Sequence, residues 1–294
     1  MTALFDLPLQ RVDVGDGMHI AARVAGEGPP LLLLHGHPQT HVIWHRVWPA
    51  LTARYTCIAA DLRGYGDSDK PPASPDHAAH SKRVMARDMV NLMRALGHER
   101  FDVLAHDRGA RVAHRLAMDH AERVGRMMLL DIAPTLDMYQ GTTRAFAQAY
   151  YHWFWLIQPA PMPETMIGHD PVFYVRAVMG GRPGGLAIFD PRALAEYERC
   201  AALPGLPVGI CEDYRASATL DLEHDRADRV AGRKLACPVR VLWGARGAVG
   251  RNFDVLALWR AVAGEVDGEA LDAAHYLAEE VPDAVTERAL AFFG

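Results

Sequence analysis

The chain has 294 residues, of which 50% are hydrophobic and 23% charged, and its formal net charge at pH 7 is −5. This composition is typical of a globular protein with a substantial core, and it offers neither the basic run that nucleic acid would favour nor the ~18 apolar residues of a membrane span. The four cysteines form no CxxC motif, and residues 1–13 do not resemble a signal peptide, so we expect a reduced, cytoplasmic protein.

Strand patterns and helical patterns alternate along most of the chain. Strands are predicted at 10–14, 19–24, 30–34, 55–60, 101–105, 126–130, 238–244 and 270–273, and helices at 81–96, 255–262 and 282–292. The first two strands are expected to form a hairpin. The alternation predicts an α/β protein with a mostly parallel central sheet and helices on both faces.

The alternation stops near Pro134, where an aromatic, helical stretch begins. It continues to about Arg233 and is broken by prolines between 158 and 163. We interpret this stretch as an inserted helical cap. The predicted division is therefore an N-terminal core part at 1–134, a cap at 135–233 and a C-terminal core part at 234–294.

A sharp turn is predicted where the strand at 101–105 meets the next helix. The sequence Ala105-His106-Asp107-Arg108-Gly109 has small residues two places on either side of Asp107, as a nucleophile elbow requires. Asp107 stands where many such elbows hold serine. A carboxylate is already an anion at neutral pH, so it can displace a leaving group from a saturated carbon and form an alkyl ester. The alternative is an aspartate that only caps the helix.

Polar residues follow several of the other predicted strands. His37, Asp131 and His275, like Asp107, each come after a strand. Because the working residues of open α/β sheets lie at the carboxyl ends of strands, we expect these four to meet at one site.

Motifs in both the core and the cap resemble those of a known family. His35-Gly36-x-Pro38, Asp61-x-Arg63-Gly64-x-Gly66-x-Ser68 and the elbow resemble the α/β-hydrolase fold. The elbow arginines, Tyr151-His152-Trp153 and Asp213-Tyr214-Arg215-Ala216 resemble the fluoroacetate (haloacetate) dehalogenases. The resemblance extends over nearly the whole chain.

The resemblance implies a two-step hydrolysis. Asp107 would displace halide from a haloacetate, and water activated by His275 would then hydrolyse the ester to glycolate. An acid is needed to orient the histidine, and Asp131 is assigned to this role because residues 242–247 offer no carboxylate. The alternatives are a structural histidine and an aspartate that caps a turn.

Arg108 and Arg111 lie three residues apart and therefore on neighbouring positions of one helix face. Guanidinium groups bind carboxylates through paired hydrogen bonds, so the substrate is expected to be a small halogenated carboxylic acid. These charges would also keep Asp107 ionised. Surface ion pairs with residues such as Asp119 are the alternative.

Further site residues are implied by the resemblance. His152, Trp153 and Tyr214 would donate hydrogen bonds to the halide, although an aromatic stripe can also be simple cap packing. The oxyanion of the second step would be bound by the backbone N–H groups of His37 and Arg108. The resemblance implies a homodimer. The chemistry requires no cofactor, and no metal is expected because the histidines form no ligand motif.

The sequence departs from the resembling family at two places. His37 stands where phenylalanine is common. The stretch 179–185, with glycines at 180, 181, 184 and 185, stands where a tryptophan is expected. Loss of that bulk predicts a looser pocket wall, weaker restriction to two-carbon acids and weaker defluorination.

Other functions remain open on the sequence. An epoxide hydrolase uses the same Asp–His–acid residues with cap tyrosines, for which Tyr214 and either Tyr150 or Tyr151 are available, but it usually has an aromatic residue where this chain has Arg108. A haloalkane dehalogenase is disfavoured for the same reason. A non-catalytic ligand receptor of this fold is disfavoured by the complete set of catalytic residue types.

Overall fold

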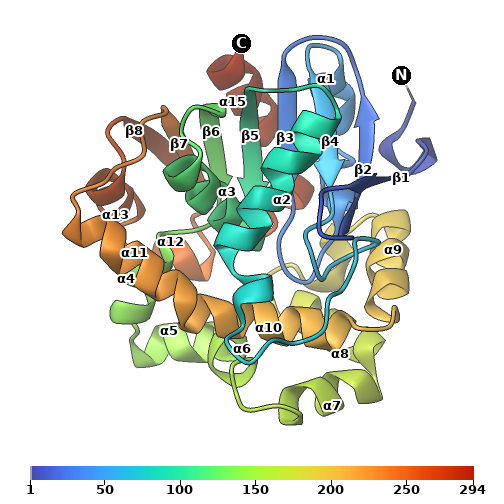
Figure 1. The fold of residues 1–294 in the computed structure, drawn as a ribbon, viewed down its shortest axis with the longest axis vertical. Helices are drawn as coiled ribbons and strands as arrows, with labels where there is room; N and C mark the ends of the chain where they lie inside the picture. Colours follow the sequence, from blue (N-terminus) through green and yellow to red (C-terminus); the bar gives the residue numbers. More distant parts are fainter. Residues whose placement is uncertain (1) are drawn as a thin grey trace.

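The computed structural model describes residues 2–294, which form one eight-stranded sheet in the order β1-β2-β4-β3-β5-β6-β7-β8 (Figure 1). The strands are β1 Gln10–Asp13, β2 His19–Ala25, β3 Pro30–Leu34, β4 Thr56–Ala60, β5 Phe101–His106, β6 Val124–Leu130, β7 Val239–Gly244 and β8 Val266–Leu271. The pairs β1–β2 and β2–β4 are antiparallel and all other pairs are parallel. The predicted α/β class and mostly parallel sheet are confirmed.

The central strands are continuous apolar runs because both of their faces are covered. In β3, all residues after Pro30 are buried, and the predicted bounds of this strand are correct. The last strand was predicted wrongly at 270–273. β8 begins four residues earlier and ends before Asp272. Its sequence, VDGEAL, lies at the sheet edge with only Leu271 buried, so it carries little apolar signal.

Helices of the core pack on both faces of the sheet. The bounds are α1 Trp48–Thr52, α2 Lys82–Ala95, α3 Asp107–Asp119, α12 Ala248–Asn252, α13 Val255–Val262, α14 Leu277–Glu280 and α15 Pro282–Phe293, with short 3-10 turns at Leu4–Asp6, His41–Trp44 and Ala78–His80. Apolar residues of α2, α3 and α13 share one buried cluster. Those of α1 and α15 share a second cluster, so the two clusters correspond to the two covered faces.

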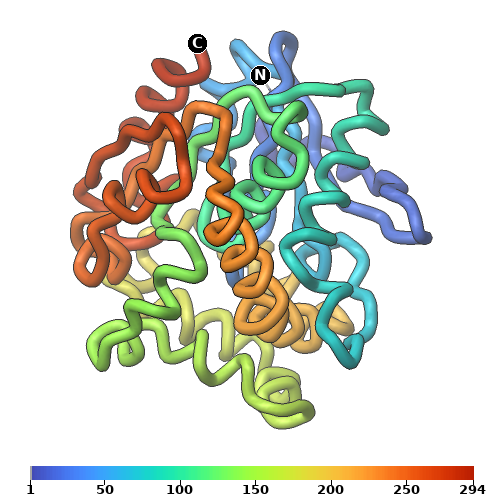
Figure 2. The backbone as a smooth tube through the Cα atoms, turned by 60° about the vertical axis from the view of Figure 1, so that its left-hand side comes forward, coloured from blue at the N-terminus to red at the C-terminus, as the bar shows by residue number. Residues whose placement is uncertain are grey.

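The helices between β6 and β7 gather below the carboxyl ends of the parallel strands (Figures 1 and 2). They are α4 Thr135–Gln140, α5 Arg144–Ala149, α6 Tyr151–Trp155, α7 Met162–His169, α8 Pro171–Gly180, α9 Pro191–Ala201, α10 Leu206–Ala218 and α11 Leu220–Val230, with a 3-10 turn at Gly185–Ile188. All of them fall inside the predicted cap. Its boundaries at 134/135 and 233/234 stay a prediction.

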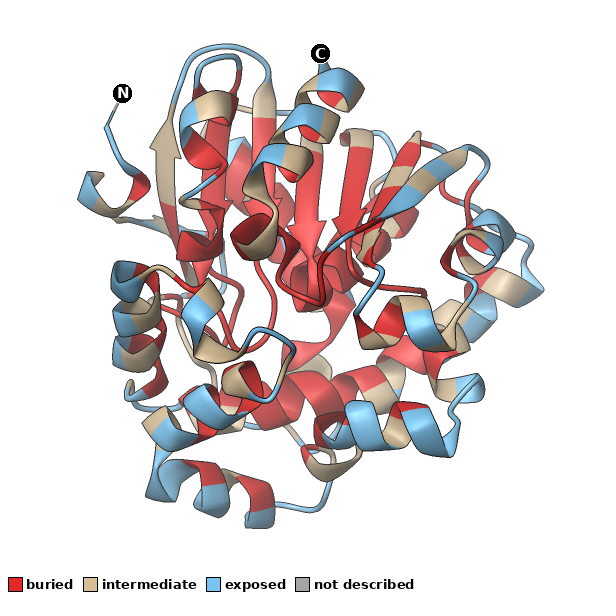
Figure 3. Ribbon diagram, turned by 180° about the vertical axis from the view of Figure 1, so that it is seen from behind, coloured by how far each residue is buried: buried red, intermediate tan, exposed pale blue. Residues whose placement is uncertain are grey.

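Local sequence signals explain where several cap helices begin. The Asp170 carboxylate accepts a hydrogen bond from the Phe173 N–H at 2.8 Å, and Pro171 occupies the first turn of α8. Buried positions continue from the central strands into the cap, while the outermost cap helices expose one face (Figure 3). Across the described range, no helix combines the length and the apolar character required to cross a bilayer.

Candidate active site

The elbow between β5 and α3 sets the position of Asp107. Its φ of +44° lies in the left-handed region, which non-glycine residues rarely adopt. A Cβ on Gly109 would lie 2.4 Å from the His35 carbonyl oxygen, and one on Gly36 would lie 2.4 Å from the Asp107 Cβ. Glycine is therefore required at both places. The steric requirement predicted for Gly109 is confirmed, and Gly36 has the same role from the neighbouring strand.

Asp107 is buried, and one of its oxygens is already bound. The His37 backbone N–H donates to Asp107 Oδ1 at 3.0 Å, whereas no residue within 2–294 donates to Oδ2. Burial raises the pKa of Asp107, but the neighbouring histidines and arginines outweigh burial and hold this pKa well below its usual range. Asp107 is therefore an anion with one oxygen free to react.

His275 and Asp131 are joined at the carboxyl ends of their strands. His275 Nδ1 lies 2.6 Å from Asp131 Oδ2, and the Gly244 N–H donates to Asp131 Oδ1 at 2.9 Å. Burial lowers the pKa of His275 to about 3 and raises the pKa of Asp131 to about 7. The imidazole is therefore neutral at neutral pH, and its Nε2 is available as a base.

Arg108 is buried, and its guanidinium group is bound to another residue instead of being free to approach Asp107. Its Nε and Nη2 donate to the two oxygens of Asp213, each at 2.8 Å, and Lys82 pairs with the same carboxylate. Its guanidinium lies 4.1 Å from the centroid of the Tyr214 ring. Nη1 is the guanidinium nitrogen that finds no partner within the described chain. Sequence reasoning quoted Asp213 only as part of a motif and missed this ion pair.

Arg111 is buried and has no carboxylate within ion-pair distance in residues 2–294. Its Nη1 donates to Thr135 Oγ1 at 2.8 Å and to the Ala133 carbonyl at 3.2 Å, while its Nε has no partner. The guanidinium lies 4.6 Å from the centroid of the Trp153 ring. A buried cation that forms no ion pair is costly, and the charge of Asp107 acts on Arg111 only without direct contact, so an anionic ligand would stabilise this arrangement.

The three proposed halide donors line the cap side of the site. Trp153 and Tyr214 are fully buried, yet Trp153 Nε1 and the Tyr214 hydroxyl find no hydrogen-bond partner in the described chain. The His152 ring lies 5.8 Å from that of Tyr214. Burial, followed by the positive charge of Arg182, lowers the pKa of His152 well below its ordinary value. Unpaired buried donors indicate a missing acceptor.

His37 connects the core to the cap. Its Nε2 lies 3.0 Å from the Tyr174 hydroxyl in α8, and its ring stacks on that of His152 at 6.0 Å. Burial lowers the pKa of His37 to about 3. The side chain at this departure from the family pattern is thus a neutral ring that contacts the cap, while its backbone N–H lies at Asp107.

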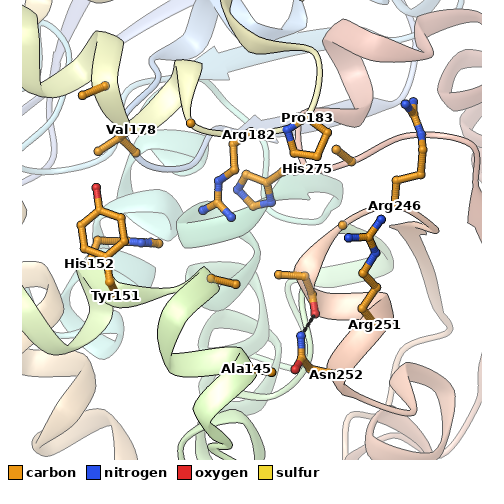
Figure 4. A pocket seen from close by; sticks show the side chains of 16 residues that line it. Ala145, Tyr151, His152, Val178, Arg182, Pro183, Arg246, Arg251, Asn252 and His275 are labelled. Atoms are coloured by element: carbon orange, nitrogen blue, oxygen red, sulfur yellow. Dashed lines mark hydrogen bonds between the residues drawn. The ribbon is translucent and has the colours of Figure 1, made fainter.

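A cavity of about 410 Å³ leads to the site (Figure 4). His152 and His275 are among its sixteen lining residues, which include Arg182, Arg246 and Arg251 but no aspartate or glutamate. Sequence reasoning missed Arg182, although it is the one charged residue in the stretch 179–185. The wall that was expected to be loose therefore carries a large cationic side chain.

One group of potential metal ligands exists among residues 2–294, formed by Asp67, Glu196 and Cys200. Arg199 pairs with both of its carboxylates. The group includes none of the residues at Asp107, so the site described above is not built around it.

Comparisons with known proteins agree with this geometry. Residues 29–277 match the α/β hydrolase fold family, and the chain belongs to that family. It is 44% identical to a fluoroacetate dehalogenase of Burkholderia sp., over 92% of this chain and 89% of the relative. The resemblance to the haloacetate dehalogenases is therefore confirmed.

Two further proteins are similar to this chain over most of its length. The chain is 35% identical to a soluble epoxide hydrolase of Corynebacterium sp. (strain C12), over 92% of this chain and 91% of that protein. Among solved structures, ALR0039 of Nostoc sp. PCC 7120, provisionally named an α/β hydrolase, superposes with a TM-score of 0.95 at 50% identity and covers 99% of both chains.

Proposed function

We propose that the protein is a hydrolytic dehalogenase that converts haloacetates, including fluoroacetate and chloroacetate, to glycolate and halide. One observation carries the proposal: an ionised Asp107 shares a buried site with a His275–Asp131 pair, with the unpaired Arg111, and with the unpartnered donors of Trp153 and Tyr214. The similarity to a fluoroacetate dehalogenase supports it.

In the first step, Asp107 Oδ2 attacks the carbon that bears the halogen. Oδ2 is assigned because Oδ1 accepts the His37 N–H. A carbon–oxygen bond forms, the carbon–halogen bond breaks, and the halide leaves with the electron pair. Arg111 Nε and Arg108 Nη1 would bind the substrate carboxylate, while His152, Trp153 and Tyr214 would donate to the departing halide.

In the second step, a water molecule attacks Cγ of the Asp107 ester. His275 Nε2 accepts the proton of the water, and the Asp131 carboxylate stabilises the resulting imidazolium. Negative charge develops on Oδ1, which already receives the His37 N–H. Glycolate leaves with the original Oδ2 and takes the proton held by His275, while the oxygen of the water stays in Asp107 and the second proton of the water is released. The sum is haloacetate and water to glycolate, halide and a proton, without a cofactor or metal.

The proposal includes a homodimer, as the resemblance implies, and a cytoplasmic location, as the scattered cysteines predict. Exposed apolar side chains of α6, α7 and α8, among them Tyr151, Met166 and Phe173, offer a surface for self-association. Light scattering of the purified protein gives the oligomeric state directly.

The deciding experiment measures halide release from fluoroacetate and chloroacetate by the purified protein, with Asp107→Asn as the control. Halide from the wild type but not from the variant supports the proposal. A His275→Asn variant incubated with chloroacetate should accumulate the ester, seen by mass spectrometry as one carboxymethyl group on the peptide that contains Asp107. Absence of both halide and adduct would refute the dehalogenase function.

Epoxide hydrolysis is the second candidate. The Tyr214 hydroxyl is buried and unpartnered, and the Tyr150 ring lies 6.3 Å from that of His275, so two cap tyrosines are available to protonate an opening epoxide. The similarity to a soluble epoxide hydrolase also favours it. Turnover of styrene oxide without halide release would select this function. Binding without turnover of either substrate would indicate a receptor.

A further inference from the structure

Arg182 is held at the wall of the cavity by a short turn. Its N–H donates to the Met179 carbonyl at 3.3 Å, and its own carbonyl accepts the Gly185 N–H at 3.0 Å. Gly184 and Gly185 both have positive φ values, of 90° and 59°, so the turn depends on glycine. The glycine-rich stretch therefore fixes the backbone of Arg182 and directs one long side chain at the cavity (Figure 4).

The charge of Arg182 has no carboxylate partner within ion-pair distance in residues 2–294. Its guanidinium lies 4.8 Å from the centroid of the Tyr150 ring. The other two arginines of the cavity differ from it, because Arg246 pairs with Asp272 at 3.0 Å and Arg251 is exposed. Among residues 2–294, no aspartate or glutamate lines the cavity. Arg182 is thus a partly buried cation, and it would be stabilised by an anionic group of the substrate other than the carboxylate assigned to Arg111.

Arg111 and Arg182 flank the same pair of aromatic rings. Arg111 lies over Trp153 and Arg182 over Tyr150, and the two ring centroids are 5.7 Å apart. The charges of both arginines also act on His275. Two arginines without carboxylate partners therefore lie close to the reacting groups, and one of them, Arg182, also lines the cavity.

We infer that Arg182 is a specificity-determining residue that binds a second carboxylate, and that the preferred substrates are α-halo dicarboxylic acids of the succinate type. The inference rests on the proposed dehalogenase function. With 2-chlorosuccinate, Arg111 would hold the carboxylate next to the halogen, and Arg182 would hold the one on the side chain. Asp107 would displace chloride from C2, and hydrolysis of the ester would release malate with inverted configuration at C2.

The test compares two racemic substrates of equal chain length, 2-chlorosuccinate and 2-chlorobutanoate, by chloride release. The wild type should show the higher kcat/KM on 2-chlorosuccinate. In Arg182→Gln, the ratio of kcat/KM for the dicarboxylate to that for the monocarboxylate should fall roughly ten- to hundredfold, as expected for loss of a charge-assisted hydrogen bond. Arg182→Lys should recover part of this ratio.

Arg251→Gln is the matched control, because it removes one positive charge from the same cavity without altering the turn at Arg182. Its substrate ratio should stay that of the wild type. The inference is overturned if the wild type has the higher kcat/KM on 2-chlorobutanoate, or if Arg182→Gln lowers kcat/KM for both substrates by the same factor. It is also overturned if Arg251→Gln changes the substrate ratio as much as Arg182→Gln does. Chloroacetate is run beside them. Failure of all three substrates refutes the dehalogenase function itself, whereas chloroacetate turnover without a preference for the dicarboxylate refutes only this inference.

Discussion

Arg108 of α3 and Asp213 of α10 form a two-point ion pair in which neither side chain is exposed to solvent. The pair ties the first turn after the elbow to the cap. It also leaves Arg108 with a single unpaired nitrogen, Nη1. Arg108 is therefore a fixed donor at the site, and the unpaired charge available to a substrate carboxylate belongs mainly to Arg111.

Replacing Asp213 should reduce the stability of the fold more than it reduces binding of the substrate. Asp213→Asn leaves the buried cations Arg108 and Lys82 without their shared counter-charge, and we expect the free energy of unfolding to fall by about 3–5 kcal/mol. Urea denaturation measures it. As the control, Asp267→Asn breaks an exposed pair with Arg240 and should cost about 1 kcal/mol or less. Similar losses in the two variants would contradict a structural role for the buried pair.

Arg111 is expected to dominate binding of the substrate carboxylate. Arg111→Gln should raise KM for chloroacetate and lower kcat/KM by roughly ten- to hundredfold, the usual consequence of losing a charge-assisted hydrogen bond. Arg111→Lys keeps the charge but loses the planar donor geometry, so it should recover only part of the loss. Steady-state kinetics of halide release give both constants. Unchanged KM in Arg111→Gln would place the carboxylate elsewhere.

Trp153 should contribute more to the release of fluoride from fluoroacetate than to the release of chloride from chloroacetate. Its Nε1 is buried without a partner in the described chain, and fluoride depends more strongly than chloride on hydrogen-bond donors as it leaves. Trp153→Phe should lower kcat for fluoroacetate by about a hundredfold, with a smaller loss for chloroacetate. Steady-state kinetics of halide release, measured for each substrate separately, give kcat for both reactions. Equal losses would mean that Trp153 only packs the cap.

Structural features that depend on a local pattern of residues could be predicted from the sequence. Buried strands such as β3 and the elbow at Asp107 follow from apolar runs and from small residues at fixed spacing. The edge strand β8 was predicted in the wrong place because its exposed residues lack that signal. The pairing of Asp131 with His275 was expected from the resemblance, and the fold allows it because both residues follow parallel strands, β6 and β8, which are separated only by β7.

Contacts between distant segments escaped prediction. Asp213 reaches Arg108 from 105 residues away, and no local pattern encodes that distance. The position of Arg182 was not predicted, because the glycines around it were interpreted as the loss of a large side chain. In the structure these glycines form the turn that places the Arg182 side chain at the cavity. The donors Trp153 and Tyr214 were expected from resemblance, but only the fold shows that both lack partners in the described chain.

Stability should depend on pH through Glu279, which lies where α14 meets the cap. Its Oε1 accepts the Tyr197 hydroxyl at 2.6 Å, while Oε2 has no hydrogen-bond partner in the described chain. Burial raises the pKa of Glu279 from 4.5 to about 8. Between these values the folded chain holds a proton that the unfolded chain has lost, so stability falls as pH rises through this window.

Glu279→Gln should remove this dependence, because the amide is neutral at every pH and can still accept the Tyr197 hydroxyl. Urea denaturation at several pH values inside the window should show the wild type losing about 1.4 kcal/mol per pH unit relative to the variant. Asp131, whose pKa is raised to about 7, adds the same sign of dependence to both proteins, so it cancels in the difference. Glu287→Gln, on an exposed glutamate, is the control and should leave the slope unchanged. Parallel stability curves for wild type and Glu279→Gln would show that Glu279 is ionised in the folded chain and that Arg46, whose Nε lies 3.8 Å away, compensates its charge.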